Sequence, residues 1–255
     1  MTIMIRAAEK ASRTLLRDFN EVEQLQISRK GPGDFVTAAD KKSEKTIFEE
    51  LQKARPDFSF LMEESGQIKG TDRDNVWIID PIDGTHNFMH GIPHWCISIG
   101  LEHKGQIVAG LIYDCVKDEM FTAEKGTGAW LRNKRLRISG RSNLEQCMVN
   151  FGQPYGTPSE RERFFKEQAA VNEVAMVRRM GSAALDLAYV AAGRLDGYWE
   201  RNLKPWDAAA GVLLVKEAGG FVTSIENDDN PVYSANLIAG NQQVHSDIRK
   251  IVKSI

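Results

Sequence analysis

Carboxylate side chains follow directly on one apolar run of the sequence. The run Trp77-Ile-Ile79 leads into Asp80, Pro81, Ile82, Asp83, Gly84 and Thr85. Two carboxylates three residues apart thus stand at the end of an expected strand, where proline restricts the bend. The Gly-Thr step is able to present backbone N–H groups to an anion at the start of a helix. The pattern predicts a place where metal and phosphate meet.

A simple turn is the alternative explanation for this segment, because Asp is common in turns. Other acids favour a metal site: Glu63 and Glu64 follow a second apolar run, and Asp207 opens a helix-like stretch. Mg²⁺ prefers carboxylate, carbonyl and water oxygens, and carboxylates placed together without a cation repel one another. The sequence therefore predicts a site for hard divalent cations.

Several helices and strands must position these acids. Apolar residues at three- and four-residue steps predict helices over Ile3–Leu25, Ala39–Ala54, Ser159–Asn172, Ser182–Ala192, Asp207–Ala218 and Val244–Ser254. Strands are expected over Ser59–Met62, Val76–Asp80, Val174–Arg178, Phe221–Ser224 and Leu237–Ala239. Apolar runs separated by turn signals predict antiparallel strands from Trp95 to Ser139. Helices therefore bracket sheets in a layered α+β architecture.

The length and composition are those of an ordinary folded protein. The 255 residues suffice for a single domain, 1–255, or for two packed halves, about 1–140 and 141–255. With 33 basic and 35 acidic residues, the chain has no general field for nucleic acid or anionic membrane. We expect neither as a partner, so an anionic substrate must be held locally.

Cysteine usage and hydropathy indicate the compartment. Cys96, Cys115 and Cys147 are widely spaced in or beside apolar runs, which predicts buried free thiols in a reducing compartment. No apolar run approaches the ~20 residues that cross a bilayer. We therefore expect a cytoplasmic protein.

Three histidines suggest a different metal. His86, His90 and His94 occur at four-residue steps, as zinc ligands on a helix do. Gly91 and Pro93 would interrupt that helix. The histidine pattern is therefore weaker evidence than the acidic one.

The acidic motifs resemble those of the inositol monophosphatase family, part of the lithium-sensitive, magnesium-dependent phosphatases, over nearly the whole chain. Four motifs occur in the family's order: Asp34-Phe-Val-Thr-Ala-Ala-Asp40, Glu63-Glu-Ser65, Asp80-Pro-Ile-Asp-Gly-Thr85 with Asn87-Phe88, and Trp206-Asp-Ala-Ala-Ala-Gly211 with Glu217-Ala-Gly-Gly220. The sequence is most similar to the bacterial type of inositol-1-monophosphatase. The resemblance implies a layered α-β-α-β-α sandwich, the sugar phosphatase fold of the family, and a homodimer inhibited by lithium.

The resemblance also implies two to three Mg²⁺ ions. Their ligands would be Glu63, Asp80, the carbonyl of Ile82, Asp83, Asp207 and Asp40. Asp80 would be shared by the first two ions, and Asp40 would hold waters of a third, weaker ion. Met62 and His86 stand where the family often has Gly and Thr, and neither departure removes a ligand.

Roles in catalysis and substrate binding come from the same resemblance. The catalytic residues would be Glu63, Thr85 and Asp83, with the Thr85 hydroxyl and Glu63 orienting the attacking water. The substrate contacts would be Asp83, Gly84, Thr85, Gly181, Ser182, Ala183, Glu200 and Asp207. Among these, the amides of Gly84 and Thr85 would receive the phosphate, and Glu200 would accept hydrogen bonds from substrate hydroxyls.

The expected reaction is Mg²⁺-dependent hydrolysis of the phosphate monoester of a small polyol, myo-inositol 1-phosphate, by a metal-activated water. Fructose-1,6-bisphosphatase, histidinol-phosphate phosphatase and 3′-phosphoadenosine phosphate phosphatase share the metal motifs and are the alternatives within the resemblance. A protein-binding regulator on the same fold is the alternative from another class. The retained acids argue against a regulator that has lost its chemistry.

Overall fold

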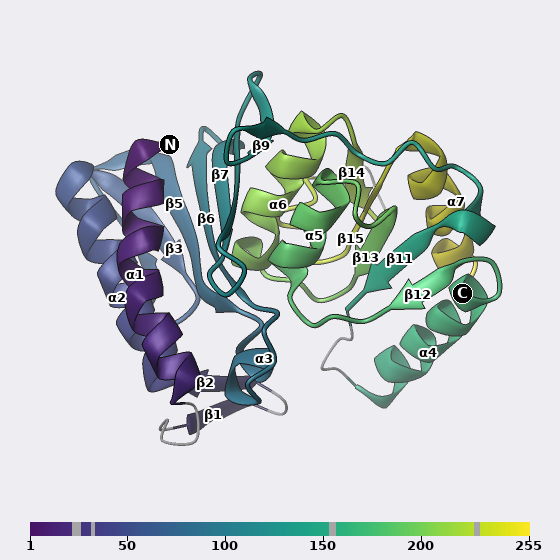
Figure 1. Cartoon of the computed structure of the whole chain (residues 1–255), viewed down its shortest axis with the longest axis horizontal. Coiled ribbons are helices and arrows are strands. Elements are labelled where there is room, and N and C mark those ends of the chain that lie inside the picture. Colours follow the sequence, from purple (N-terminus) through teal and green to yellow (C-terminus); the bar gives the residue numbers. More distant parts are fainter. Residues whose placement is uncertain (22–26, 32–33, 153–156, 227–229) are drawn as a thin grey trace.

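The computed structural model describes residues 1–21, 27–31, 34–152, 157–226 and 230–255. Layers of helices and sheets alternate along its longest axis (Figure 1). The helices are α1 (Thr2–Asn20), α2 (Ala38–Ala54), α3 (Thr85–Met89), α4 (Pro158–Asn172), α5 (Ala183–Ala191), α6 (Pro205–Glu217) and α7 (Gln242–Lys253), with a 3₁₀ turn at Leu144–Gln146.

The strands form three sheets. A hairpin contains β1 (Ile27–Gly31) and β2 (Asp34–Thr37). The eight-stranded sheet, in spatial order, contains β10 (Lys134–Arg135), β9 (Gly128–Leu131), β8 (Glu119–Glu124), β7 (Gln106–Asp114), β6 (Cys96–His103), β5 (Asp72–Asp83), β3 (Phe58–Met62) and β4 (Gly66–Ile68). The five-stranded sheet contains β12 (Met176–Arg178), β11 (Met148–Phe151), β13 (Gly197–Glu200), β15 (Leu237–Gly240) and β14 (Phe221–Ser224).

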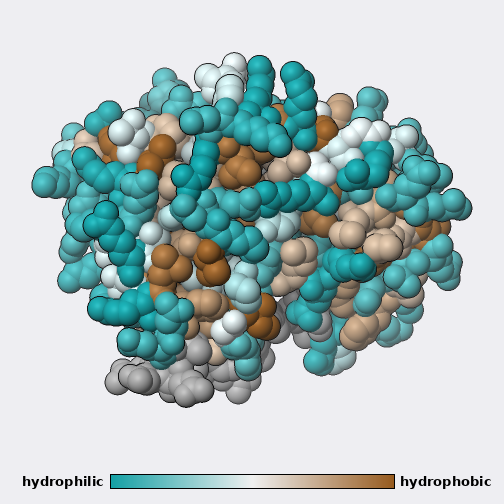
Figure 2. Space-filling model, viewed as in Figure 1, coloured by the Kyte–Doolittle hydropathy of each residue, from teal (hydrophilic) through white to brown (hydrophobic). Residues whose placement is uncertain are grey.

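The layers follow the order α-β-α-β-α. Helices α1 and α2 cover one face of the eight-stranded sheet, α5 and α6 lie between the two large sheets, and α4 and α7 cover the far face of the five-stranded sheet (Figure 1). Hydrophilic residues cover most of the face shown in Figure 2. The α+β layered sandwich expected from the sequence is therefore confirmed.

Helix α2 begins at a cap that the sequence encodes. The Thr37 side chain accepts hydrogen bonds from the amides of Ala39 and Asp40, and the Asp40 carboxylate accepts one from the Thr37 amide at 2.8 Å. Such reciprocal capping satisfies N–H groups that a helix start leaves unpaired. Ile47 and Leu51 are buried in the core between α2 and the eight-stranded sheet. The cap fixes Asp40 in the first turn of α2.

Several expected boundaries are corrected by the structure. The first helix ends at Asn20 rather than Leu25, which lies outside the described residues. The expected strand Val76–Asp80 runs from Asp72 to Asp83. Strands β11 and β13 are not among the strands expected from the sequence.

The three cysteines lie in the interior of the fold. Cys96, Cys115 and Cys147 are buried and free, as expected. In the described part of the chain, no helix combines the length and apolar character needed to cross a bilayer.

One hydrophobic cluster extends across the boundary between the expected halves. It includes Ile78 and Ile112 of the eight-stranded sheet, Leu187 and Leu214 of the central helices, and Leu237 of the five-stranded sheet. A core shared in this way is typical of one cooperative unit. We propose that residues 1–255 form a single domain whose two halves are packed together.

Small residues let α6 approach the eight-stranded sheet closely. A Cβ atom at Gly110 of β7 would lie 3.0 Å from both the Cα and the carbonyl oxygen of Ala210 in α6. The contact is with helix backbone, which cannot move aside as a flexible side chain does. The position of α6, and with it that of Asp207, therefore depends on glycine at this point.

We predict that Gly110→Ala lowers the free energy of unfolding by about 1–3 kcal/mol, the usual cost of overpacking. Gly140→Ala is the matched control, because a Cβ atom there meets nothing within 4 Å. Urea unfolding of both variants measures the difference. Equal stability of the two would show that α6 is not held by this contact.

Candidate active site

A bulge in β5 brings Asp80 and Asp83 to one place. In a regular strand, residues three apart point to opposite faces of the sheet. Here Asp80 pairs with Ser98 and Asp83 with Cys96 of β6, so three steps on β5 match two on β6. The extra residue lies at Pro81-Ile82, where proline lacks the N–H that a ladder needs. The bulge therefore turns both carboxylates toward the same space.

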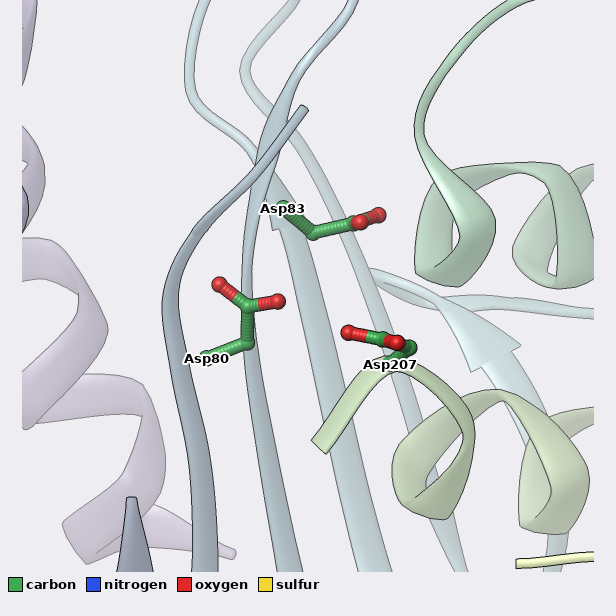
Figure 3. Close-up of side chains that lie close together, drawn as sticks. All are labelled: Asp80, Asp83 and Asp207. Carbon is green, nitrogen blue, oxygen red and sulfur yellow. The ribbon is translucent and has the colours of Figure 1, made fainter. Parts of the chain in front are cut away.

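A third acid completes the cluster from another layer. Oxygens of Asp80, Asp83 and Asp207 lie within 4.8 Å of one another. Figure 3 shows Asp207, in the first turn of α6, directed toward the two acids of β5. One Asp207 oxygen accepts a hydrogen bond from the Lys204 amide at 2.7 Å. In the described residues, this group of potential ligand side chains contains neither His nor Cys.

Glu63 lies beside Asp80. Strands β3 and β5 are parallel, with Met62 opposite Ile79, so the residues that follow the pair are neighbours. The Glu63 amide donates to the Ile79 carbonyl at 3.2 Å. The charge of Glu63 is among the influences that raise the pKa of Asp80. Thus four of the expected metal ligands are brought together.

The electrostatics of the cluster oppose ionisation in the absence of a cation. Burial raises the pKa of Asp80 well above its ordinary value, and the charges of Glu63, Asp83 and Asp207 raise it further. Burial likewise raises the pKa of Asp207 and of Asp83. A buried carboxylate without a cation is costly. The donor set consists of hard oxygens, so the residues present fit a divalent ion such as Mg²⁺.

Asp83 is held by the start of α5. It accepts hydrogen bonds from the Ser182 hydroxyl at 2.5 Å, the Ala184 amide at 2.7 Å and the Ala183 amide at 3.2 Å. These bonds lower the pKa of Asp83 against the larger effect of burial. The expected substrate segment, residues 181–183, therefore lies against the acid cluster, and its Ser182 side chain is directed to Asp83.

Thr85 connects the cluster with α2. Its hydroxyl lies 3.0 Å from the Ile82 carbonyl and 3.2 Å from Oδ1 of Asp40, and both are acceptors. Gly84 precedes it with φ of 99°, a left-handed conformation that glycine adopts without strain. Asp40 is fully buried, and burial raises its pKa. The structure thus places Thr85, Ile82 and Asp40 in one hydrogen-bonded group.

Glu200 enters from the five-stranded sheet. It is the last residue of β13, and its carboxylate accepts a hydrogen bond from the Tyr198 hydroxyl. Burial raises the pKa of Glu200 to about 8, with further upward effects from Asp186 and Asp83. Its charge in turn contributes to the raised pKa of Asp207. Glu200 is therefore close enough for its charge to interact with the charge of Asp207.

Asn87 joins two parts of the site, and sequence reasoning assigned it no role. Its side-chain amide donates to the carbonyls of His94 at 2.7 Å and Met180 at 2.8 Å. It thereby ties α3, which begins at Thr85, to the loop that leads into Ser182. The available signal was its place in the Asn87-Phe88 motif, two residues beyond Thr85.

A layered fold with an oxygen-only acid cluster at the carboxyl ends of two parallel strands is typical of a metal-binding enzyme. The sequence model that describes the inositol monophosphatase family matches residues 1–255 of this chain. The inositol-1-monophosphatase of Mesorhizobium japonicum is 50% identical over 254 residues, which cover 99% of this chain and 96% of that protein. The chain therefore belongs to the inositol monophosphatase family, whose members are metal-dependent phosphatases.

Two further comparisons carry a different name. Nus factor SuhB of Escherichia coli K12 is 42% identical over 245 residues, covering 96% of this chain and 92% of that protein. The crystal structure of the extragenic suppressor protein suhB from Bartonella henselae has a TM-score of 0.95 at 51% identity, and the match covers 99% of this chain and 98% of that one. Proteins named inositol-1-monophosphatase and proteins named SuhB are thus both similar to this chain.

We predict that Asp80→Asn stabilises the metal-free protein. Oδ1 of Asp80 already accepts the Ile82 amide at 3.0 Å, so an Asn can keep that bond and turn its NH₂ group toward Glu63. Each kcal/mol of repulsion removed should raise the melting temperature by about 2–4 °C. Melting at neutral pH in chelator measures this change.

The same variant should lose most of the stabilisation that added Mg²⁺ gives the wild-type chain. Asp247→Asn, an acid of α7 remote from the cluster, is the control and should behave as wild type. A lower metal-free melting temperature for Asp80→Asn would contradict the repulsion argument.

Proposed function

We propose that this chain hydrolyses the phosphate monoester of a small polyol, myo-inositol 1-phosphate, in a Mg²⁺-dependent reaction. The observation that supports the chemistry is the cluster of Asp80, Asp83 and Asp207 with Glu63 beside it. The relative from Mesorhizobium japonicum, named inositol-1-monophosphatase, supports the substrate. Relatives with the two names are about equally similar, at 50% for this phosphatase and 51% for the suhB protein of Bartonella henselae, so the acid cluster carries the proposal rather than the degree of identity.

Two to three Mg²⁺ ions are proposed. Their ligands would be Glu63, Asp80, the Ile82 carbonyl, Asp83 and Asp207, and Asp40 would hold waters of the third ion. Bound there, Mg²⁺ lowers the pKa of a coordinated water and stabilises negative charge on the leaving oxygen. The raised pKa values of the acids support this assignment, because a cation relieves the repulsion that raises them.

The chain's own residues orient the attacking water in this proposal. The Thr85 hydroxyl hydrogen is directed to Asp40 or the Ile82 carbonyl, so the lone pairs of the Thr85 oxygen accept a hydrogen bond from water. Glu63 accepts a second bond from the same water and takes up its proton. The amides of Gly84 and Thr85 donate to phosphate oxygens.

Substrate selection is assigned to residues beyond the phosphate. Asp83, which Ser182 and α5 hold in place, and Asp207 would also contact the substrate. The Gly181–Ala183 segment lines the ring of the polyol, and Glu200 accepts hydrogen bonds from ring hydroxyls. We further propose a cytoplasmic homodimer that lithium inhibits.

A regulator that binds a protein partner is the second candidate. The observation in its favour is the name Nus factor carried by the Escherichia coli relative. The two roles are separable, because a regulator acts without the acid cluster. Complementation of a strain that lacks this chain by an inactive Asp80→Asn variant would favour regulation, and failure to complement would favour catalysis.

The expected outcome for the wild-type chain is phosphate release that requires Mg²⁺, stops with chelator and returns when Mg²⁺ is restored. Malachite green assays with phosphates of inositol, fructose, histidinol and adenosine decide the substrate. Inositol monophosphate should have the highest kcat/KM. Full activity in metal-free buffer would overturn the mechanism, whereas preference for another phosphate would correct only the substrate.

Glu200→Gln should change substrate preference. Above its pKa of about 8, Glu200 is a carboxylate, and a neutral amide is a weaker acceptor than a carboxylate. At such a pH, bonds to charged groups contribute about 1.5–3 kcal/mol, or roughly ten- to a hundredfold in affinity. The ratio of kcat/KM for inositol phosphate to that for an aryl phosphate should fall by this factor at saturating Mg²⁺. An equal loss on both substrates would mean that Glu200 acts through the metal site or the fold.

A further inference from the structure

Three polar residues on one face of α2 contact the segments that carry the site acids. Asp40, Ser43 and Glu44 occupy positions i, i+3 and i+4, and each is 2% exposed or less. Such spacing places side chains together on one helix face. Polar residues are seldom buried without a partner, so the contacts of these three define what this face does.

Each of the three contacts a different part of the site. Asp40 accepts from Thr85, and the Ser43 hydroxyl donates to the Pro81 carbonyl at 3.3 Å, within the β5 bulge. Glu44 contacts the turn between β3 and β4. Helix α2 therefore touches the three-residue turn that contains Glu63 as well as the bulge between Asp80 and Asp83.

Glu44 holds that turn with both carboxylate oxygens. Oε2 accepts the Glu64 amide at 2.7 Å, and Oε1 accepts the Ser65 hydroxyl at 2.5 Å. Both donors are neutral and both come from the residues directly after Glu63. Because hydrogen bonds to a buried carboxylate are stronger than neutral ones, this contact restrains the turn more than a neutral side chain would.

Glu63 is consequently fixed from both sides. Its own amide is held by Ile79 of β5, and the next amide is held by Glu44 of α2. Without this restraint, repulsion from Asp80 would push the turn of Glu63 outward. We infer that Glu44 is a positioning residue that keeps Glu63 at the metal cluster and thereby raises the affinity for Mg²⁺, an inference that rests on the proposed function.

The test is calorimetric titration of MgCl₂ into the metal-free wild-type chain and into Glu44→Ala. Residues that orient metal ligands typically alter metal affinity by roughly ten- to a hundredfold. We expect the Mg²⁺ dissociation constant of Glu44→Ala to rise by that factor. Glu44→Gln should recover most of the affinity, because its amide can accept from Glu64 and donate to the Ser65 oxygen. The rise in melting temperature with Mg²⁺ is an independent readout.

Glu50→Gln is the matched control on the same helix, since Glu50 pairs with Arg6 and Lys10 of α1. It should leave Mg²⁺ affinity unchanged. If Glu44→Ala does not fold, Ser65→Ala removes one of the two donors at an exposed position, and a several-fold weaker affinity is expected. Unchanged affinity in the foldable variants would mean that Glu44 only stabilises the hairpin and would overturn the inference alone. Absence of Mg²⁺ binding by the wild-type chain would overturn both the inference and the proposed function.

Discussion

Repulsion among clustered carboxylates is the constraint on which the rest of the site depends. Asp80, Asp83 and Asp207 have oxygens within 4.8 Å of one another, and these carboxylates accept hydrogen bonds from backbone amides, a hydroxyl and a thiol. Neutral donors orient a carboxylate without cancelling its charge. The fold therefore fixes the geometry of the cluster and leaves its charge to be balanced by a cation.

Holding repelling groups together requires anchors from several layers. The bulge in β5 sets the direction of Asp80 and Asp83, α6 delivers Asp207, and α5 holds Asp83 through three donors. Each anchor belongs to an element whose other side is packed in a hydrophobic core. The free energy of that packing opposes the repulsion, which is why close contacts such as Gly110 against α6 matter for chemistry as well as for stability.

Much of this organisation could be predicted from the sequence, because the acids stand beside strong local signals. The apolar run before Asp80 and the helical spacing after Ala39 predicted the elements that carry the acids and the layered fold. Two features could not be predicted. The bulge is a matter of register with β6, which depends on a partner strand, and the burial of Glu44 depends on a turn twenty residues away. Strand β13, Gly-Tyr-Trp-Glu, has no alternation of apolar and polar residues by which the sequence could identify it.

In the proposed mechanism, the groups that act on the phosphate and Glu200, which would contact the alcohol, lie on different layers of the molecule. The acids on β5 and the turn after β3 belong to the eight-stranded sheet, whereas Glu200 belongs to the five-stranded one. Contacts near the site that connect the two parts include those of Asp83 with the start of α5 and of Asn87 with the Met180 carbonyl. Because Glu200 contributes no part of the β5 bulge or of the α2 contacts, a change at its position can alter the fit of the alcohol while the groups around the phosphate keep their geometry.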